Sequence, residues 1–241
     1  MRHARVERWS QGASTLHRRH AASKIIAALA VLVCVATLTS HSVRACLAYL
    51  ALLVTAVTVA RLPVIRLLAN AAAVLPFAVC FGVISAISGQ PDRAVMLVVR
   101  GYLSSLTALL LIATTPMPEL LAGFEVLHAP RFLLQVMQFL YRYLIVLMQE
   151  ALAMRDAGAS RAGSIRTFHD IRSLEFRKAA GAAGVLFARA YSRAQAIHRA
   201  MVARGFEGHI PRFRVTPFRL TDGIFAGAVV AVAAGVRMLL V

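Results

Sequence analysis

Acidic residues are scarce in this chain: 10 Asp and Glu stand against 27 Lys and Arg among its 241 residues, and the formal net charge is +17. Charged residues of either sign make up only 15%, whereas 59% of the residues are hydrophobic. That hydrophobic content would leave large apolar patches on the surface of a water-soluble domain. A soluble globular protein is therefore excluded. We expect an all-α integral membrane protein, because helices satisfy their backbone hydrogen bonds within lipid.

Residues for disulfide or metal chemistry are also few. Cysteine occurs three times, at Cys34, Cys46 and Cys80, an odd number without any CxxC spacing. Neither a disulfide framework nor a zinc site is indicated. The eight histidines are scattered, mostly in polar segments: His3, His17, His20, His41, His128, His169, His198 and His209. We expect no metal site and no cofactor on this chain.

The motifs of an ATPase or a hydrolase are absent from the sequence. A P-loop requires Gly-Lys-Ser/Thr, but the two lysines, Lys24 and Lys178, follow Ser23 and Arg177. There is no HExxH, no GxSxG and no pair of carboxylates inside an apolar run. We therefore expect a chain that is not an enzyme.

Four apolar runs follow a basic segment, residues 1–24. We interpret residues 25–115 as four transmembrane helices, with apolar runs at about residues 25–40, 45–60, 64–87 and 94–115. Pro76 lies inside the third run and predicts a kink, because proline removes a backbone hydrogen bond. Arg100 lies about two turns inside the fourth run, where a charge indicates either a functional residue or a side chain that reaches toward the headgroups.

A further apolar stretch, residues 132–154, permits two interpretations. Its hydrophobicity is compatible with a membrane span, because several Leu, Ile and Phe offset the roughly 3 kcal/mol that Arg142 costs at mid-bilayer. At about 100° per residue, however, its polar side chains fall on one stripe, which is typical of an amphipathic helix. That stripe consists of Gln135, Gln138, Arg142, Gln149 and Glu150.

Loop charge favours the amphipathic interpretation. Residues 155–219 contain 12 Arg and one Lys against four acidic residues, and residues 1–24 carry a net charge of +5. Positive loops remain on the cytoplasmic side, so both segments belong inside. We predict a cytoplasmic tail at residues 1–24, a cytoplasmic region at residues 116–220 and a last transmembrane helix at residues 221–241.

Three helices are predicted within residues 116–220. Pro116 begins a short helix that extends to about Leu127, and Pro130 begins a second that ends near Gly158 or Gly163. The third extends from Asp170 or Ser173 to Arg204, with Gly205 as a left-handed stop. Its middle contains Gly181 and Gly184, where small residues permit another helix to cross closely. We expect two long crossed helices.

Basic residues follow one face of that third helix. Lys178, Arg189, Arg193 and Arg204 project within about 80° of each other. Such a stripe is typical of a solvated or lipid-contacting face as well as of a partner site. Arg204 in the last turn also interacts favourably with the helix dipole without any partner.

Several motifs resemble one transporter family. They are Thr-Thr-Pro-Met-Pro-Glu-Leu-Leu at 114–121, Pro-Arg at 130–131, Tyr-Arg-Tyr-Leu at 141–144 and Ala-Met-Val-Ala-Arg-Gly-Phe at 200–206. In this order they resemble the transmembrane T component of energy-coupling factor (ECF) transporters, in particular the cobalt and nickel uptake subgroup. The resemblance covers about residues 110–210. The four apolar runs within residues 25–115 resemble the family only in their general character.

The resemblance implies a coupling subunit of an ATP-driven importer in the bacterial cytoplasmic (inner) membrane. Two ATP-binding cassette ATPases would carry the ATP and Mg²⁺. A membrane substrate-binding subunit, with or without a small accessory membrane subunit, would carry Co²⁺ or Ni²⁺. The resemblance leaves open a vitamin as the substrate in place of a metal ion. Nucleic acid is not among the implied partners.

In this family two x-Arg-x motifs at the ends of the crossed helices contact the two ATPases. The second motif corresponds to Ala203, Arg204 and Gly205. The first departs from Ala-Arg-Gly: Arg161 is the candidate, with Arg155 as the other. The apolar side of the second helix is our candidate contact for the substrate subunit, namely Phe132, Leu133, Leu140 and Leu144.

Two other classes of protein fit parts of the pattern. A membrane-anchored adaptor would use the basic region to bind anionic lipid or nucleic acid, with steep salt dependence. A stand-alone permease would need an ion pathway lined by buried carboxylates, and the sequence contains no such set.

Overall fold

The computed structural model describes residues 14, 16, 19–38, 43–89, 91–161, 171–208 and 220–240. Within these ranges the regular structure is helical throughout, without a strand. The chain divides into two compact units, Met1–His128 with Arg214–Val241 and Ala129–Phe213.

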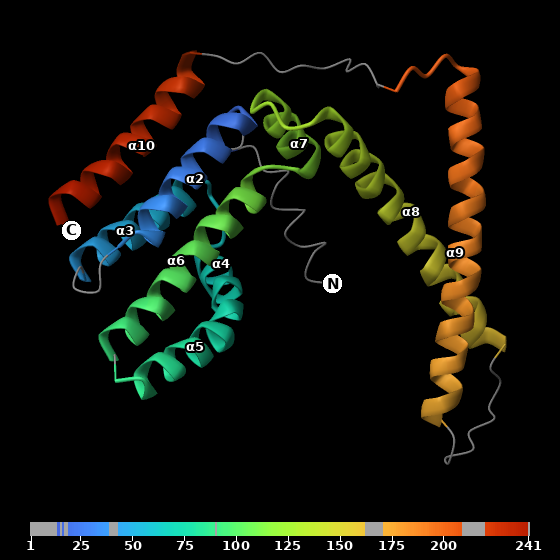
Figure 1. Ribbon diagram of the computed structural model, residues 1–241, viewed down its shortest axis with the longest axis horizontal. Helices are drawn as coiled ribbons and strands as arrows, with labels where there is room; N and C mark the ends of the chain where they lie inside the picture. The colour runs from blue at the N-terminus through green and yellow to red at the C-terminus, as the bar shows by residue number, and fades with distance from the viewer. Residues whose placement is uncertain are drawn as a thin grey trace. The chain divides into compact units, whose positions relative to one another are not determined.

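The first unit is a helical bundle centred on α2, which packs against α6, α7 and α10. Figure 1 shows α10 along α2, and α5 turning back along α6. The elements are α2 (Ala21–Ala36), α3 (Val43–Val59), α4 (Val64–Ala71), the 3-10 helix η1 (Ala72–Val74), α5 (Leu75–Ile87), α6 (Pro91–Thr114), α7 (Met117–Val126) and α10 (Leu220–Leu240).

The apolar runs predicted from sequence correspond to these helices. Among the described residues, four helices are long and apolar enough to cross a membrane: Val64–Ile87, Asp92–Thr114, Arg131–Ser160 and Leu220–Met238. Two shorter apolar helices, Ala21–Ala36 and Arg44–Val59, correspond to the first two runs. The all-α architecture of a multi-pass membrane protein is confirmed. By length and composition the stretch after Pro130 also qualifies as a span, in line with its hydropathy.

The third run is interrupted where proline predicts a kink. Helix α4 ends at Ala71, the 3-10 turn Ala72–Val74 follows, and α5 begins at Leu75 with Pro76 in its first turn. Proline is tolerated there because the first amides of a helix have no intrahelical acceptor. The predicted break is therefore confirmed.

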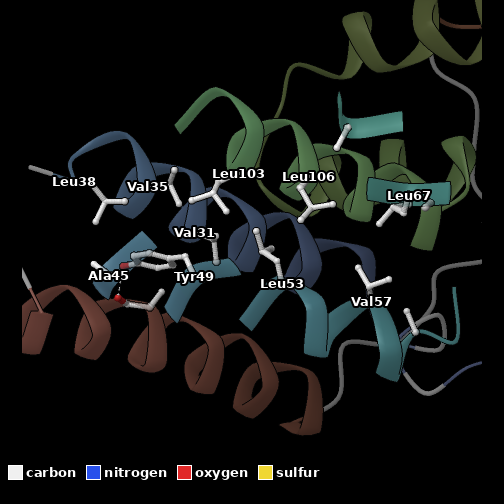
Figure 2. Close-up of a cluster of buried hydrophobic side chains, with 14 of the residues drawn as sticks. Val31, Val35, Leu38, Ala45, Tyr49, Leu53, Val57, Leu67, Leu103 and Leu106 are labelled. Atoms are coloured by element: carbon white, nitrogen blue, oxygen red, sulfur yellow. Dashed lines mark hydrogen bonds between the residues drawn. The ribbon is translucent and has the colours of Figure 1, made fainter. Parts of the chain in front are cut away.

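The core of the first unit is a stripe of buried side chains from several helices (Figure 2). On α3 the buried residues recur every four positions, at Ala45, Tyr49, Leu53 and Val57, so they share one helix face. The hydroxyl of Tyr49 donates a 2.7 Å hydrogen bond to the carbonyl oxygen of Ala233 in α10. This bond satisfies the polar atom of a fully buried aromatic side chain.

Many large apolar side chains lie on the outer surface of the bundle. Ile65, Phe77 and Ile87 expose 83%, 70% and 82% of their surface, respectively. Such side chains would be unfavourable against water but are suited to lipid tails. The exposure pattern therefore agrees with a membrane-embedded unit.

The second unit consists of two long helices, α8 (Arg131–Arg161) and α9 (Ile171–Ala203). Their 31 and 33 residues correspond to about 47 and 50 Å of helix. The start of α8 after Pro130 and its end between Gly158 and Gly163 agree with the sequence prediction. Figure 1 shows α9 crossing α8 near the C-terminal part of α8.

Helix α7, the first helix of the predicted cytoplasmic region 116–220, packs on α2 in the first unit. The two helices approach closely at Gly123, where an added Cβ would lie 3.0 Å from the Ala21 carbonyl carbon and 2.8 Å from Ile25 Cδ1.

Candidate functional site

Helix α9 ends in a well-defined turn that contains the predicted second motif. The amide of Gly205 donates a 3.0 Å hydrogen bond to the Val202 carbonyl, and the amide of Phe206 donates a 3.0 Å bond to Met201. Gly205 has φ of 78°, the left-handed conformation that glycine adopts at low cost. These two bonds form a Schellman motif, so the predicted stop at Gly205 is confirmed.

Arg204 therefore occupies the last position before the left-handed glycine. Ala203, Arg204 and Gly205 are all exposed, and the backbone around them is held by the Schellman bonds. A guanidinium at this position lies at the negative end of the helix dipole. The arrangement presents a cation at the end of a long helix, with five donors in a planar group that matches a carboxylate.

The first predicted motif is described in part. Arg161 is the last residue of α8, whereas its side chain and the following residues Ala162 and Gly163 lie outside the described residues. The other candidate, Arg155, lies within α8 and has its Nη2 3.0 Å from Oδ1 of Asp156, both side chains being exposed. Of Arg155 and Arg161, only Arg161 lies at the end of a helix. Arg204 occupies the corresponding position at the end of α9.

The four apolar residues predicted on α8 are all exposed. Phe132, Leu133, Leu140 and Leu144 expose between 50% and 78% of their surface. Further along α8, Ile145, Met148 and Leu152 are exposed as well, which sequence reasoning left out. A large exposed apolar surface of this kind marks a contact with lipid or with another protein.

The contact between α8 and α9 lies elsewhere than predicted. An added Cβ at Gly181 or Gly184 would meet nothing within 4 Å, so none of the described elements approaches these glycines closely. Instead, Glu150 of α8 forms ion pairs with Arg189 and Arg193 of α9, at 3.3 and 3.4 Å. The prediction of a close crossing at the glycines is therefore wrong for α8 and α9, since two arginines hold the contact further along α9.

A group of charged residues at one end of the first unit was missed by sequence reasoning. The Nζ of Lys24 donates a 2.9 Å hydrogen bond to the carbonyl of Thr114 at the end of α6. Asp222 in the first turn of α10 is buried, with Nη1 of Arg19 3.7 Å away and the amide of His20 3.4 Å away. In the sequence, this group could have been predicted from the charged residues that lie directly beside apolar runs.

Arg100 lies within α6, as expected, and is half-buried. Its Nε is buried without a hydrogen-bond partner among the residues that the structure describes. No group of three or more His, Cys, Asp or Glu side chains suited to a metal ion occurs in the described part of the chain.

The sequence of this chain matches a known protein family over most of its length. The sequence pattern of the CbiQ family, described as cobalt transport protein, matches residues 12–214. The chain belongs to the CbiQ family. The matched residues include every described helix from α2 to α9 and the Schellman turn, so the similarity to the family extends well beyond the motifs at residues 110–210.

Individual relatives resemble the chain over about half of its length or less. The chain is 30% identical over 120 residues to the cobalt transport protein CbiQ of Rhodobacter capsulatus, which covers 50% of this chain and 47% of the relative. It is 36% identical over 100 residues to the nickel permease LarQ of Lactiplantibacillus plantarum. This match covers 41% of this chain and 34% of the relative. An uncharacterized protein of Methanocaldococcus jannaschii, MJ1089, is 33% identical to the chain over 109 residues. This match covers 45% of this chain and 39% of the relative. The matches therefore span less than half the length of each relative.

Proposed function

We propose that this CbiQ-family membrane protein is the coupling subunit of an energy-coupling factor importer for cobalt or nickel ions. It transmits the ATP-driven motion of two ATPase subunits to a membrane subunit that binds the substrate, and it is not itself catalytic. The observation that carries the proposal is the exposed Arg204 at the rigid end of α9, a helix that is joined to α8 by ion pairs. Family membership supports the transport role, and one relative is named for cobalt, another for nickel.

We assign the proposed partners to two parts of the second unit, the helix ends and the exposed apolar side of α8. Arg204, with Ala203 and Gly205 beside it, binds one ATPase, and Arg161 at the end of α8 binds the other. The exposed apolar side chains of α8, Phe132, Leu133, Leu140 and Leu144, contact the substrate-binding membrane subunit. ATP and Mg²⁺ belong to the ATPases, and Co²⁺ or Ni²⁺ belongs to the substrate subunit.

Arginine suits a contact that transmits force. Its planar guanidinium binds a carboxylate through two parallel hydrogen bonds, and this geometry is more defined than a single ammonium contact. The Schellman turn adds a backbone that holds the direction of the helix end. When the ATPases close, the two helix ends move together, and α8 and α9 change their crossing angle. The apolar face of α8 then displaces the substrate subunit.

The proposed location is the bacterial cytoplasmic membrane, with the N-terminus, α8 and α9 on the cytoplasmic side. The charge distribution supports this orientation, since residues 155–219 and residues 1–24 contain most of the excess positive charge. With α8 lying in the membrane interface rather than across the bilayer, both helix ends reach cytoplasmic ATPases.

Charge reversal at two positions of α9 tests the proposal. Arg204→Glu is expected to abolish co-purification of the ATPase subunits from native membranes, together with ATP-dependent uptake of cobalt or nickel. Arg199→Glu is the matched control, because Arg199 is an exposed arginine on the same helix but not at its end. Equal effects of the two variants would contradict coupling through a helix end and would support an adaptor that binds anionic surfaces through its overall charge.

A further inference from the structure

Glu150 of α8 lies between two arginines of α9. Nη1 of Arg189 donates a 3.3 Å hydrogen bond to Glu150 Oε1, and Nη2 of Arg193 lies 3.4 Å from Oε2. The Glu150 side chain is only 17% exposed, whereas the two arginine side chains are 57% and 43% exposed. The carboxylate is therefore enclosed by the crossing, with the guanidinium groups extending from it toward the surface.

The face of α9 beside Glu150 is built from short side chains. Val185, Ala188 and Ser192 line the same groove as Glu150 and the two arginines. They recur at intervals of three and four residues, so they form one stripe. The Ser192 hydroxyl donates its hydrogen bond to the Ala188 carbonyl, 2.9 Å away, so that donor is already engaged within α9. The short stripe brings α8 close enough for the carboxylate to reach both guanidinium groups.

This contact lies at similar distances from the ends of the two helices. Eleven residues separate Glu150 from Arg161 at the end of α8, and eleven separate Arg193 from Arg204 after the end of α9. At 1.5 Å per residue, each interval corresponds to about 16 Å of helix. The Glu150–Arg193 pair therefore lies at equal distances along the helices from the two arginines that we propose to contact the ATPases, whereas Arg189 lies fifteen residues, about 22 Å, before Arg204.

We propose that Glu150, Arg189 and Arg193 form the fulcrum of the two coupling helices. This inference rests on the proposed function, because it assigns the point about which the two levers turn. Arg189 and Arg193 are four residues apart on one face of α9, so the carboxylate exchanges one guanidinium for the other as the crossing angle changes. The point at which α8 and α9 cross therefore stays fixed while the angle between them changes. Arms of similar length then convert equal displacements of the two ATPases into a nearly symmetric rotation. All three are positioning residues.

Spin labels test the fulcrum in the purified chain. Labels at positions 157 and 200, both exposed, lie seven residues beyond Glu150 and Arg193 toward the helix ends. In nanodiscs, Glu150→Gln and Glu150→Arg are expected to broaden the distance distribution between the labels. The triple variant Glu150→Arg, Arg189→Glu, Arg193→Glu restores the opposite charges and is expected to narrow it again. Asp156→Asn is the matched control, because it removes an ion pair that lies within α8 alone.

The complex isolated from native membranes gives the functional measurement. Glu150→Gln is expected to retain the ATPase subunits at the wild-type level while the number of metal ions taken up per ATP hydrolysed falls several-fold, with recovery in the triple variant. An unchanged distance distribution and an unchanged uptake ratio in Glu150→Gln would overturn the fulcrum and leave the proposed function intact. Absence of ATPases from the wild-type preparation would instead overturn the proposed function, and the fulcrum with it.

Discussion

Lys24 of α2 binds the C-terminal end of α6: its Nζ donates a 2.9 Å hydrogen bond to the carbonyl oxygen of Thr114, the last residue of that helix. The last carbonyls of a helix have no intrahelical donor and carry partial negative charge, so an ammonium group satisfies both needs. Lys24 is 5% exposed. One side chain therefore connects the first helix of the bundle to the point where α6 ends and α7 follows.

Loss of this contact is expected to destabilise the first unit. Lys24→Met keeps an unbranched side chain but leaves the Thr114 carbonyl without its donor, which costs about 1–3 kcal/mol when the group is buried. We expect a fall of several degrees in the Tm of the protein in detergent, measured by thermal unfolding. Arg66→Met, which replaces an exposed cation of α4, should leave the Tm within about a degree. A Lys24→Met protein as stable as wild type would show that the contact contributes nothing to the bundle.

The close approach of α7 to α2 predicts opposite effects at two glycines. Gly123→Ala places a Cβ 3.0 Å from the Ala21 carbonyl carbon, so α7 must move away from α2 and the unit loses stability. Gly227→Ala in α10 meets nothing within 4 Å and should be neutral or stabilising, since alanine is the better helix former. Thermal unfolding of both variants in detergent checks the pair. Equal Tm values for the two would rule out steric exclusion at Gly123.

The buried hydroxyl of Tyr49 provides a third prediction. Tyr49→Phe removes the 2.7 Å hydrogen bond from α3 to the Ala233 carbonyl and leaves that carbonyl without this donor. We expect a loss of about 1 kcal/mol in the free energy of unfolding, from denaturant titration in mixed micelles. Tyr191→Phe, at a side chain that is 59% exposed, serves as the control and should change little. The hydrogen bond would lose its assigned role if the two variants behaved alike.

Membrane orientation is checked by thiol labelling of sealed cells. In a chain whose Cys34, Cys46 and Cys80 are replaced by Ala, a cysteine at the exposed position 88 between α5 and α6 should react with a membrane-impermeant reagent. A cysteine at the exposed position 200 of α9 should react only after the cells are opened. Reaction of position 200 in sealed cells would contradict the cytoplasmic placement of α9, and with it the proposed coupling to ATPases.

The features that sequence reasoning predicted correctly are local ones. Proline before a helix, at Pro116 and Pro130, and glycine after one, at Gly205, act through the backbone of adjacent residues, so short motifs are sufficient to place the ends of α7, α8 and α9. The break at Pro76 is of the same kind. The apolar runs likewise predicted the helices of the bundle, because burial in lipid requires long uninterrupted hydrophobic segments.

The features that it missed depend on residues distant in the chain. Glycine-rich sequence in α9 indicated a close crossing at Gly181 and Gly184, yet α8 contacts α9 through Glu150, 39 residues from Arg189. Small residues permit a crossing wherever they occur, and the alanine and serine at 188 and 192 permit it equally well. Which site is used depends on the ion pairs, and a carboxylate in the polar stripe of one helix does not specify its partner on another.

The sequence by itself determined that this is an all-helical membrane protein of the CbiQ family with an arginine at the end of a long helix, because hydropathy, helix caps and family motifs act over short stretches of chain. Only the tertiary structure decided that Lys24 binds the end of α6, that α7 packs on α2 at Gly123, and that α8 and α9 are joined at Glu150. These contacts join segments tens of residues apart, and their geometry depends on how side-chain volumes and charges meet after the helices have packed.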